Sequence, residues 1–312
     1  MLPVVDVLMP VYNHERYIAQ SIEGIVSQHV NFKFRLIIGE DKSPDGSRAI
    51  IEKYAAQYPD IIYPTYHEIN LGATGNGKFL FAAAKAKYIA VCEGDDYWID
   101  PTKLQRQFDF MEANPDFAVC FTKVDCINDH GEKIEGLFPE ITKDVFTIED
   151  VVMADMVFMP SATLFYRNIL PNPMPRFYVN AMSGDIAIHL LLTDKGKAKS
   201  LPGITAVYRD HAGGITKTEE AITRGYRKLF ELYEQANEYF EYRHDAVIKK
   251  RLSEMAKVRL IFGSNGKKGM KKLKYVMNNA PDYFKYSDTL SAKEAAYYFT
   301  VLFFPSLLKK KV

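Results

Sequence analysis

Hydrophobic positions recur with two different periods along the first 125 residues of the chain. Short apolar or β-branched runs predict strands, which we place at residues 4–9, 34–38, 61–66, 88–92 and 117–124. Apolar residues at helical spacing predict helices between these strands, at residues 17–26, 47–58, 77–86 and 103–114. Strands that alternate with helices of this length predict an α/β fold with a mostly parallel, doubly wound sheet.

The pattern becomes less regular after residue 125. From residue 126 to 215 we expect loops to dominate, with prolines between short apolar runs. From about residue 217 onward the pattern is helical, and no proline occurs there before Pro281. Five lysines between residues 267 and 274 form a basic patch in this region. We interpret the patch as a solvated face, with contact to a membrane or an anionic glycan as the alternative.

The composition is that of a globular protein, with 312 residues, 47% of them hydrophobic and 25% charged. A net charge of +1 gives no general attraction to nucleic acid, so we expect no nucleic-acid partner. The three cysteines have no metal-ligand spacing, and two of them, Cys92 and Cys120, are interpreted as small core residues in a reducing compartment. No signal-peptide pattern is visible at the N-terminus, and we therefore expect a cytoplasmic protein.

The longest uncharged stretch covers residues 295–308 and is followed by three lysines. It is too short to span a bilayer as a helix, and Pro305 interrupts it. An aromatic, apolar segment that ends in lysines is able to lie on a membrane surface as a peripheral contact. The alternative is a terminal segment that docks on the core of the protein itself, and both interpretations remain open.

An acidic cluster follows the predicted strand at residues 88–92. It consists of Glu93, Asp95 and Asp96, and the only tryptophan of the chain, Trp98, follows two residues after Asp96. Like charges at the end of a buried strand raise each other's energy unless a cation or a polar ligand compensates them. Oxygen ligands of this kind suit Mg²⁺ or Mn²⁺, which bind the diphosphate of a nucleotide. The alternative is a solvated loop whose acids cap the helix that begins near Pro101.

Several ordered motifs of the chain resemble those of family 2 glycosyltransferases, which are inverting enzymes of the GT-A fold. The motifs are VLMPVYN at 7–13, IVSQ at 25–28, IIGEDKSPDGS at 37–47, NLG at 70–72 and EGDD at 93–96. The resemblance covers about residues 4–215 and implies a Rossmann-like GT-A domain over residues 1–215. Its nucleotide-binding half would end near residue 125 and its acceptor half would cover 126–215, with an α-helical extension over 216–312.

The resemblance also implies roles for residues that follow the first two strands. Pro10, Val11 and Tyr12 would line the nucleoside pocket, where Tyr12 would stack on or flank the base, although an aromatic at such a turn is often only packing. Asp41 would accept a hydrogen bond from uracil N3, which cytosine lacks as a donor. The alternative role of Asp41 is to cap the helix that starts at Ser47.

The acidic motif and Lys78 complete the implied nucleotide site, and Lys42 departs from the family pattern. Asp95 and Asp96 match the DxD-type motif, with Asp95 on the ribose and Asp96 as a direct metal ligand. Lys78 would reach the nucleotide or its phosphates, or else lie on a helix surface. Lys42 stands where the family usually has glycine, so the backbone of this loop is expected to differ.

Three residues from the second half complete the implied active site. Asp185 resembles the acid that takes the proton from the acceptor hydroxyl, and its alternative role is to complement the dipole of its helix. His211 would complete the metal shell or contact the diphosphate, and the two glycines after it would let the loop fold over the donor. Arg209 would bind phosphate as a bidentate donor.

Together, these expectations describe a metal-dependent glycosyltransferase of the bacterial polysaccharide or lipopolysaccharide type. It would use Mn²⁺ or Mg²⁺ and a nucleotide-sugar donor, which we expect to be a UDP-sugar. The acceptor partner would be a glycan or a lipid-linked oligosaccharide. One alternative is a nucleotidyltransferase, which normally carries a glycine-rich basic loop near its N-terminus, and residues 1–27 contain none. The other is a non-catalytic module, if Glu40, Lys42 or Glu93 distort the pocket.

Overall fold

A computed structural model describes residues 3–154, 157–181, 184–211, 219–264 and 285–286 of the chain. The chain divides into two units, residues 1–228 and 229–312, which are treated separately below. The predicted boundary between residues 215 and 216 lies outside the described residues.

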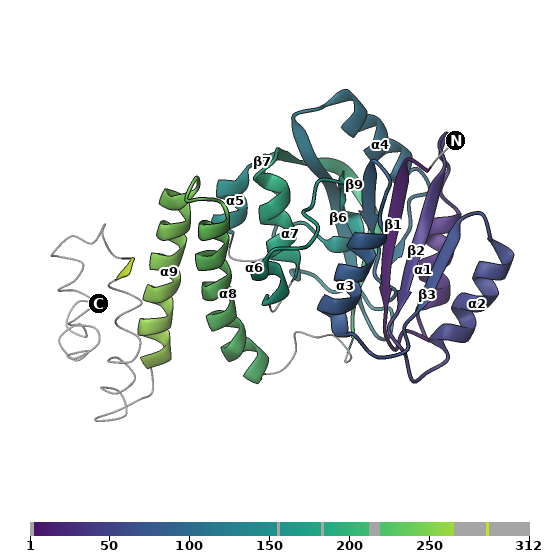
Figure 1. Ribbon diagram of the computed structural model, residues 1–312, viewed down its shortest axis with the longest axis horizontal. Helices are drawn as coiled ribbons and strands as arrows, with labels where there is room; N and C mark the ends of the chain where they lie inside the picture. The colour runs from purple at the N-terminus through teal and green to yellow at the C-terminus, as the bar shows by residue number, and fades with distance from the viewer. Residues whose placement is uncertain (1–2, 155–156, 182–183, 212–218, 265–284, 287–312) are drawn as a thin grey trace. The chain divides into compact units, whose positions relative to one another are not determined.

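The first unit is built on a nine-stranded sheet with the strand order β3-β2-β1-β4-β8-β6-β9-β5, and β7 pairs with β9 (Figure 1). The long ladders β1/β2, β2/β3, β1/β4 and β6/β9 are parallel, whereas the short β8, β5 and β7 pair antiparallel. The predicted α/β class with a mostly parallel sheet is therefore confirmed. The strands are β1 Val5–Val11, β2 Phe34–Glu40, β3 Ile62–Tyr66, β4 Tyr88–Val91, β5 Tyr97–Trp98, β6 Phe117–Asn128, β7 Val145–Phe146, β8 Phe165–Arg167 and β9 Lys197–Asp210.

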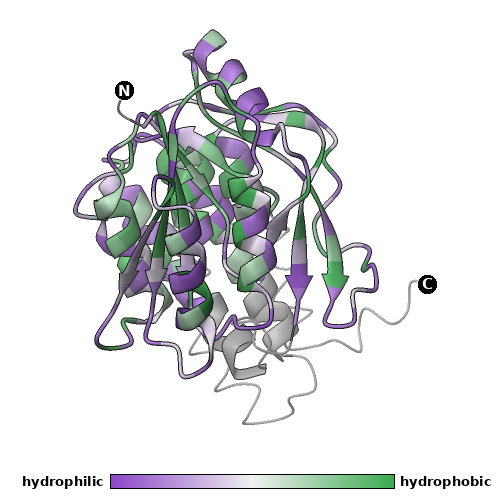
Figure 2. Ribbon diagram, turned by 90° about the vertical axis from the view of Figure 1, so that its right-hand side faces the viewer, coloured by the Kyte–Doolittle hydropathy of each residue, from purple (hydrophilic) through white to green (hydrophobic). Residues whose placement is uncertain are grey.

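Helices cover both faces of this sheet, as the alternating pattern requires. Figure 1 shows α3 on one side of the strands and α1 and α2 on the other. The described helices of the first unit are α1 Ile18–Val26, α2 Ser47–Gln57, α3 Gly72–Ala83, α4 Lys103–Ala113, α5 Ile148–Met153, α6 Arg176–Val179 and α7 Gly184–Thr193, and Ser161–Thr163 forms a 3-10 turn. The helices alternate between hydrophobic and hydrophilic residues, whereas the strands are largely hydrophobic (Figure 2).

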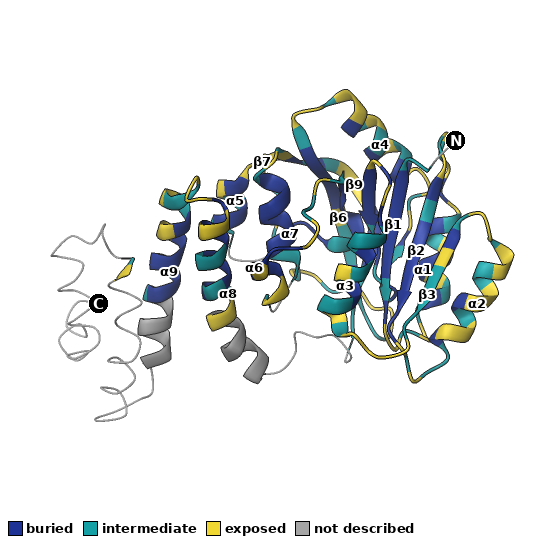
Figure 3. Ribbon diagram, in the orientation of Figure 1, coloured by how far each residue is buried: buried dark blue, intermediate teal, exposed yellow. Residues whose placement is uncertain are grey.

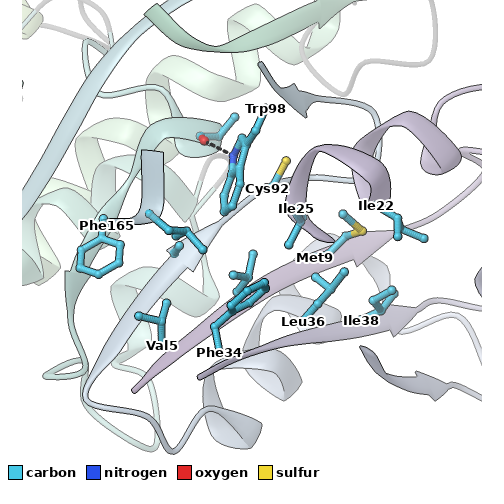
Figure 4. Close-up of a cluster of buried hydrophobic side chains, with 14 of the residues drawn as sticks. Val5, Met9, Ile22, Ile25, Phe34, Leu36, Ile38, Cys92, Trp98 and Phe165 are labelled. Carbon is cyan, nitrogen blue, oxygen red and sulfur yellow. Dashed lines mark hydrogen bonds between the residues drawn. The ribbon is translucent and has the colours of Figure 1, made fainter. Parts of the chain in front are cut away.

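The main core lies between the sheet and helices α1, α2 and α4, which cover one of its faces (Figure 3). Alternate residues of β1 point into it, and Ile18, Ile22 and Ile25 of α1 are fully buried against them. Burying each such side chain contributes about 1.5–3 kcal/mol. Trp98 joins this core and its Nε1 donates to the carbonyl oxygen of Ala162 at 2.7 Å (Figure 4). The acidic loop before Trp98 is therefore anchored at its downstream end.

A buried charge on β1 is fully compensated. Asp6 is inaccessible to solvent, and its two oxygens accept hydrogen bonds from Nε and Nη2 of Arg35 at 2.8 and 2.9 Å. The same carboxylate accepts the backbone N–H groups of Lys85 and Ala86. Because an unpaired buried carboxylate costs several kcal/mol, these contacts fix the chain where it enters β4.

Two features of the sequence-based interpretation were wrong. Residues 126–215 were expected to be mostly loops, yet they contain the 14-residue strand β9, which runs parallel to β6, and β8, which separates β4 from β6. Helix α3 begins at Gly72, before the apolar pattern that predicted a start at residue 77. Its early turns are held by Asn76, whose Nδ2 donates to the carbonyl of Gly39 at 2.7 Å. A tertiary contact thus overrides weak local propensity.

The second unit is described through two helices, α8 Glu219–Tyr239, which begins in the first unit, and α9 Asp245–Ser264. Buried apolar residues of this unit include Tyr233, Phe240, Ile248 and Leu252. Among the described residues, no helix combines the length and apolar character that crossing a membrane requires. The basic patch at 267–274 and the segment at 295–311 lie outside the described residues.

Candidate functional site

The predicted site residues of the first half, except Lys78, meet at one edge of the sheet. β1 lies between β2 and β4 and runs parallel to both, so the carboxyl ends of the three strands are neighbours. The backbone N–H of Asp41 donates to the carbonyl of Val11 at 2.9 Å, and that of Gly94 donates to the carbonyl of Pro10 at 3.2 Å. The loops after all three strands therefore form one surface, which is where α/β sheets bind ligands.

Asp41 is buried in this surface and does not cap α2. Its Oδ1 accepts the backbone N–H of Leu71 at 2.7 Å, and its carbonyl accepts Nδ2 of Asn70 at 3.1 Å. At the start of α2 the backbone N–H of Ser47 donates instead to Oδ1 of Asp45 at 3.0 Å. The alternative in which Asp41 caps the helix at Ser47 is therefore wrong, and its role toward uracil remains a prediction.

The loop after Asp41 keeps a conformation suited to glycine although lysine occupies it. Lys42 has φ of 57°, in the left-handed region that L residues rarely adopt. The turn is closed by Glu40, whose Oε1 accepts the backbone N–H of Ser43 at 2.6 Å. Glu40 and Lys42 thus support a turn of the kind that glycine favours, although a different backbone was expected here.

We expect Lys42→Gly to stabilise the first unit by about 0.5–1 kcal/mol, because glycine removes the cost of the left-handed conformation while adding entropy to the unfolded chain. Urea unfolding followed by Trp98 fluorescence measures this change. Lys42→Ala is the matched control, since alanine keeps the strain and removes only the lysine side chain. Equal stabilisation by both variants would show that the backbone conformation is not the cause.

Asp96 is the most deeply buried acid of the cluster. It is 1% exposed, and its Oδ1 accepts the backbone N–H of Arg209 at 2.9 Å. Its Oδ2 is buried and has no hydrogen-bond partner among the residues that the structure describes. Burial, followed by the negative charges of Asp95 and Glu93, raises the pKa of Asp96 well above its usual range. A cation beside Oδ2 would compensate this carboxylate.

Asp95 lies between two histidines. Its Oδ2 is 3.0 Å from Nε2 of His211, in a hydrogen bond, and 3.6 Å from Nε2 of His14. Burial alone would raise the pKa of Asp95, but the hydrogen bond from His211 and the charge of His14 outweigh it and lower that pKa. The structure thus brings His211 to the acidic motif, beside Asp95.

His14 was not found from the sequence, although it directly follows the VLMPVYN motif. Its side chain is largely buried, and burial lowers its pKa, so the imidazole is mainly neutral at neutral pH. A Cβ at Gly94 would lie 2.7 Å from His14 Nδ1. The absence of a side chain at Gly94 therefore lets the acidic loop approach His14 closely.

The residues at this edge fit a divalent cation that is shared with a bound phosphate. In the described part of the chain, no three or more His, Cys, Asp or Glu side chains are grouped to hold a metal ion by themselves. Mg²⁺ is commonly bound through one or two carboxylates together with substrate phosphates and water. The unpartnered Oδ2 of Asp96 and the pair of Asp95 and His211 are the groups that would hold it.

Asp185 reaches the acidic motif from a distant part of the sequence. It lies in the first turn of α7. Glu93 accepts a hydrogen bond from Oγ of Ser161 at 2.9 Å, and burial and then the charge of Asp185 raise the pKa of Glu93 to about 8. Burial and then Asp185 also raise the pKa of Tyr178, on α6. The structure thus places the predicted base near Glu93.

Other predicted residues lie farther from the acidic motif or have a different environment. Val11 is buried in β1, and Tyr12 is 48% exposed at the same edge. Lys78 is exposed on α3 and borders a cavity of about 230 Å³ with Phe79, Phe81 and the loop of residues 168–174. Neither the acidic motif nor His14 or His211 lines this cavity, and the contact of Lys78 with the nucleotide remains a prediction.

Comparisons with known proteins agree with the fold and with the resemblance to family 2 glycosyltransferases. The family model described as Glycosyl transferase family 2 matches residues 6–167. Uncharacterized protein Rv1520 of Mycobacterium tuberculosis is 34% identical over 204 residues, which are 65% of this chain and 58% of that protein. The chain thus spans well under two thirds of this relative.

Two solved structures have similar folds. S. aureus TarS 1–349 in complex with UDP-GlcNAc has a TM-score of 0.61 at 17% identity, over 90% of this chain and 81% of that chain. The mannosyltransferase PcManGT of Pyrobaculum calidifontis, in complex with GDP-Man and Mn²⁺, has a TM-score of 0.53 at 15% identity, over 100% of this chain and 89% of that chain. At these identities the likeness concerns the fold.

Proposed function

Because the chain belongs to glycosyl transferase family 2, we propose that it moves a sugar from a UDP-sugar to a glycan or lipid-linked acceptor, with inversion at the anomeric carbon. The observation that carries the proposal is the buried, unpartnered Oδ2 of Asp96 beside the pair of Asp95 and His211. The related folds of TarS and PcManGT were solved with UDP-GlcNAc and with GDP-Man and Mn²⁺, which supports a nucleotide-sugar donor. We assign the activity to residues 1–215.

The donor would lie along the carboxyl edge of β1, β2 and β4. Asp41 would accept the N3–H of uracil at the buried end, and Val11 and Tyr12 would flank the nucleoside. A ribose contact was expected for Asp95, but its contact with His211 favours a place at the cation. Asp95, Asp96 and His211 would therefore hold Mn²⁺ or Mg²⁺, which as a Lewis acid would neutralise the charge of the leaving diphosphate. This arrangement of uracil, nucleoside and diphosphate follows the order in which β2, β1 and β4 lie side by side in the sheet.

Asp185 would act on the acceptor. Its carboxylate takes the proton of the acceptor hydroxyl while that oxygen forms a bond to the anomeric carbon. The bond between the anomeric carbon and the diphosphate oxygen breaks at the same time, and UDP departs from the opposite face. One carboxylate is sufficient for such a single displacement, and no covalent sugar–enzyme bond forms.

The test of this proposal is calorimetry with UDP, GDP and CDP, each with Mn²⁺ and with EDTA. We expect UDP to bind more tightly than GDP or CDP, and more tightly with Mn²⁺ than with EDTA, because Asp41 would read the base and the buried Asp96 needs a cation. Asp96→Asn should remove the dependence on Mn²⁺. Asp109→Asn, at an exposed position of α4, is the matched control. Metal-independent binding would contradict the cation site, and preference for another base would contradict the role of Asp41.

A further inference from the structure

Arg209, the residue before the last of β9, contacts both aspartates of the acidic motif. Its backbone N–H donates to Oδ1 of Asp96 at 2.9 Å. Its Nη1 donates to the carbonyl oxygen of Asp95 at 2.6 Å. One residue thus fixes the side chain of one acid and the peptide plane of the other.

The guanidinium of Arg209 is itself held in place from three sides. Nη2 donates to Oε1 of Gln20 on α1, and the group lies 4.4 Å from the ring centre of Tyr97 and 5.0 Å from that of Tyr17. Arg209 is only 9% exposed. A planar guanidinium that is stacked and bonded in this way has a fixed orientation, which a lysine ammonium would not reproduce.

The same set of contacts reaches His211, the second residue that was predicted to bind the metal. Tyr17 donates its hydroxyl to Oδ1 of Asp129 at 2.6 Å, which fixes the ring. That ring lies 5.2 Å from the imidazole of His211, measured between ring centres. Arg209 and Tyr17 therefore support the acidic motif and His211 from the side that faces α1.

We propose that Arg209 is a positioning residue that holds Asp95 and Asp96 in the orientation that binds the cation, and that it does not itself bind the diphosphate. Two like charges in a buried loop repel each other, and a fixed positive group behind them offsets that repulsion. With Oδ1 of Asp96 bound by the backbone of Arg209, Oδ2 is left directed at the cation site. This inference rests on the proposed function, because it concerns the same donor site.

The test compares Arg209→Met, Arg209→Lys and Gln20→Leu with the control Arg16→Met. Arg16 is an exposed arginine that lies 5.3 Å from the ring centre of Tyr17, so its loss removes a nearby charge without removing the contacts to the aspartates. Two quantities are measured. One is hydrogen exchange of the amides of residues 94–97, and the other is UDP affinity by calorimetry with Mn²⁺ and with EDTA.

We expect Arg209→Met to speed exchange at residues 94–97 and to weaken UDP binding about 10–100-fold with Mn²⁺, as is usual for groups that orient metal ligands. Residual UDP binding in EDTA should not change. Arg209→Lys should not restore the affinity, Gln20→Leu should show a smaller change of the same kind, and Arg16→Met should show none.

An equal loss of UDP affinity with Mn²⁺ and with EDTA would overturn the proposal, because a direct contact to the diphosphate does not need the metal. Unchanged exchange at residues 94–97 would overturn it as well. If Arg209→Met does not fold, Gln20→Leu decides, since it removes one anchor of the guanidinium and leaves Arg209 in place. If the unmodified protein binds no nucleotide, the proposed function fails, and the exchange result alone decides the role of Arg209.

Discussion

Asp185→Asn is expected to lower kcat about 10²–10⁴-fold while leaving the affinity for UDP with Mn²⁺ within about twofold, because a general base contributes this much and acts only on the acceptor. Asp185 lies in the first turn of α7 and close enough to Glu93 to raise its pKa. Asparagine keeps the size of the side chain and is also favourable at a helix start, but it accepts no proton. Turnover is measured as UDP release in the presence of acceptor, and affinity by calorimetry.

Glu93→Gln is the matched control for this variant. Glutamine keeps the size of the side chain and still accepts the hydrogen bond from Ser161. We therefore expect Glu93→Gln to change kcat by less than about tenfold, since Glu93 would support the strand end and take no proton. If Glu93→Gln loses activity and Asp185→Asn keeps it, the base is Glu93 and the assignment of Asp185 is wrong.

The position of Asp41 and the acidic motif at one edge of the sheet was predictable from the sequence because it depends on local patterns and on the geometry of parallel strands. Parallel strands bring their carboxyl ends together, so polar residues placed directly after β1, β2 and β4 have to meet. The strands themselves follow from apolar runs that are buried on both faces of the sheet. Asp41 and the EGDD motif could therefore be placed at one edge without knowing any contact.

The contacts behind this edge were not predictable because they join distant segments without a periodic signal. β8 is only three residues long, and β9 contains Pro202 and Gly203, with Gly203 at φ of 96°, which are typical of a loop. Arg209 was therefore assigned to a loop and to a phosphate. Once β9 is placed beside β5 and β6, the same residue lies against the carbonyl of Asp95.

A buried lysine near this site carries the second large expected effect. Lys103 is inaccessible to solvent, its Nζ donates to Oε1 of Gln107 at 2.8 Å, and it lies 4.1 Å from the ring centre of Trp98. Burial lowers the pKa of Lys103 from 10.5 to about 7, against the opposing effects of Cys92, Cys120 and Asp100. Among the described residues, no carboxylate forms an ion pair with this amine.

The lowered pKa of Lys103 makes the stability of the first unit depend on pH. Between pH 7 and 10.5 the unfolded chain binds a proton at Lys103 that the folded chain does not. The free energy of unfolding therefore rises with pH across this window, and the gain is lost as the pH falls to 7. The full difference amounts to about 5 kcal/mol, at about 1.4 kcal/mol per pKa unit.

Lys103→Met is expected to stabilise the first unit by about 1–3 kcal/mol at pH 7 and to destabilise it by about 1 kcal/mol at pH 10. At pH 7 the variant avoids burying a charge, but it loses the contact with Trp98 and leaves Oε1 of Gln107 without its partner. At pH 10 the folded wild-type amine is neutral and the unfolded one has a pKa of 10.5, so releasing the proton on folding costs the wild type less than about 1 kcal/mol and the lost contacts dominate.

Urea unfolding followed by the fluorescence of Trp98, the only tryptophan of the chain, reports on this unit across the pH range. The difference between variant and wild type is the decisive quantity, because other titrating groups affect both proteins alike. Lys53→Met, at an exposed position of α2, tests for a general effect of removing a positive charge. A difference for Lys103→Met that stays constant between pH 7 and 10 would mean that the amine remains protonated inside the core, stabilised by the ring of Trp98.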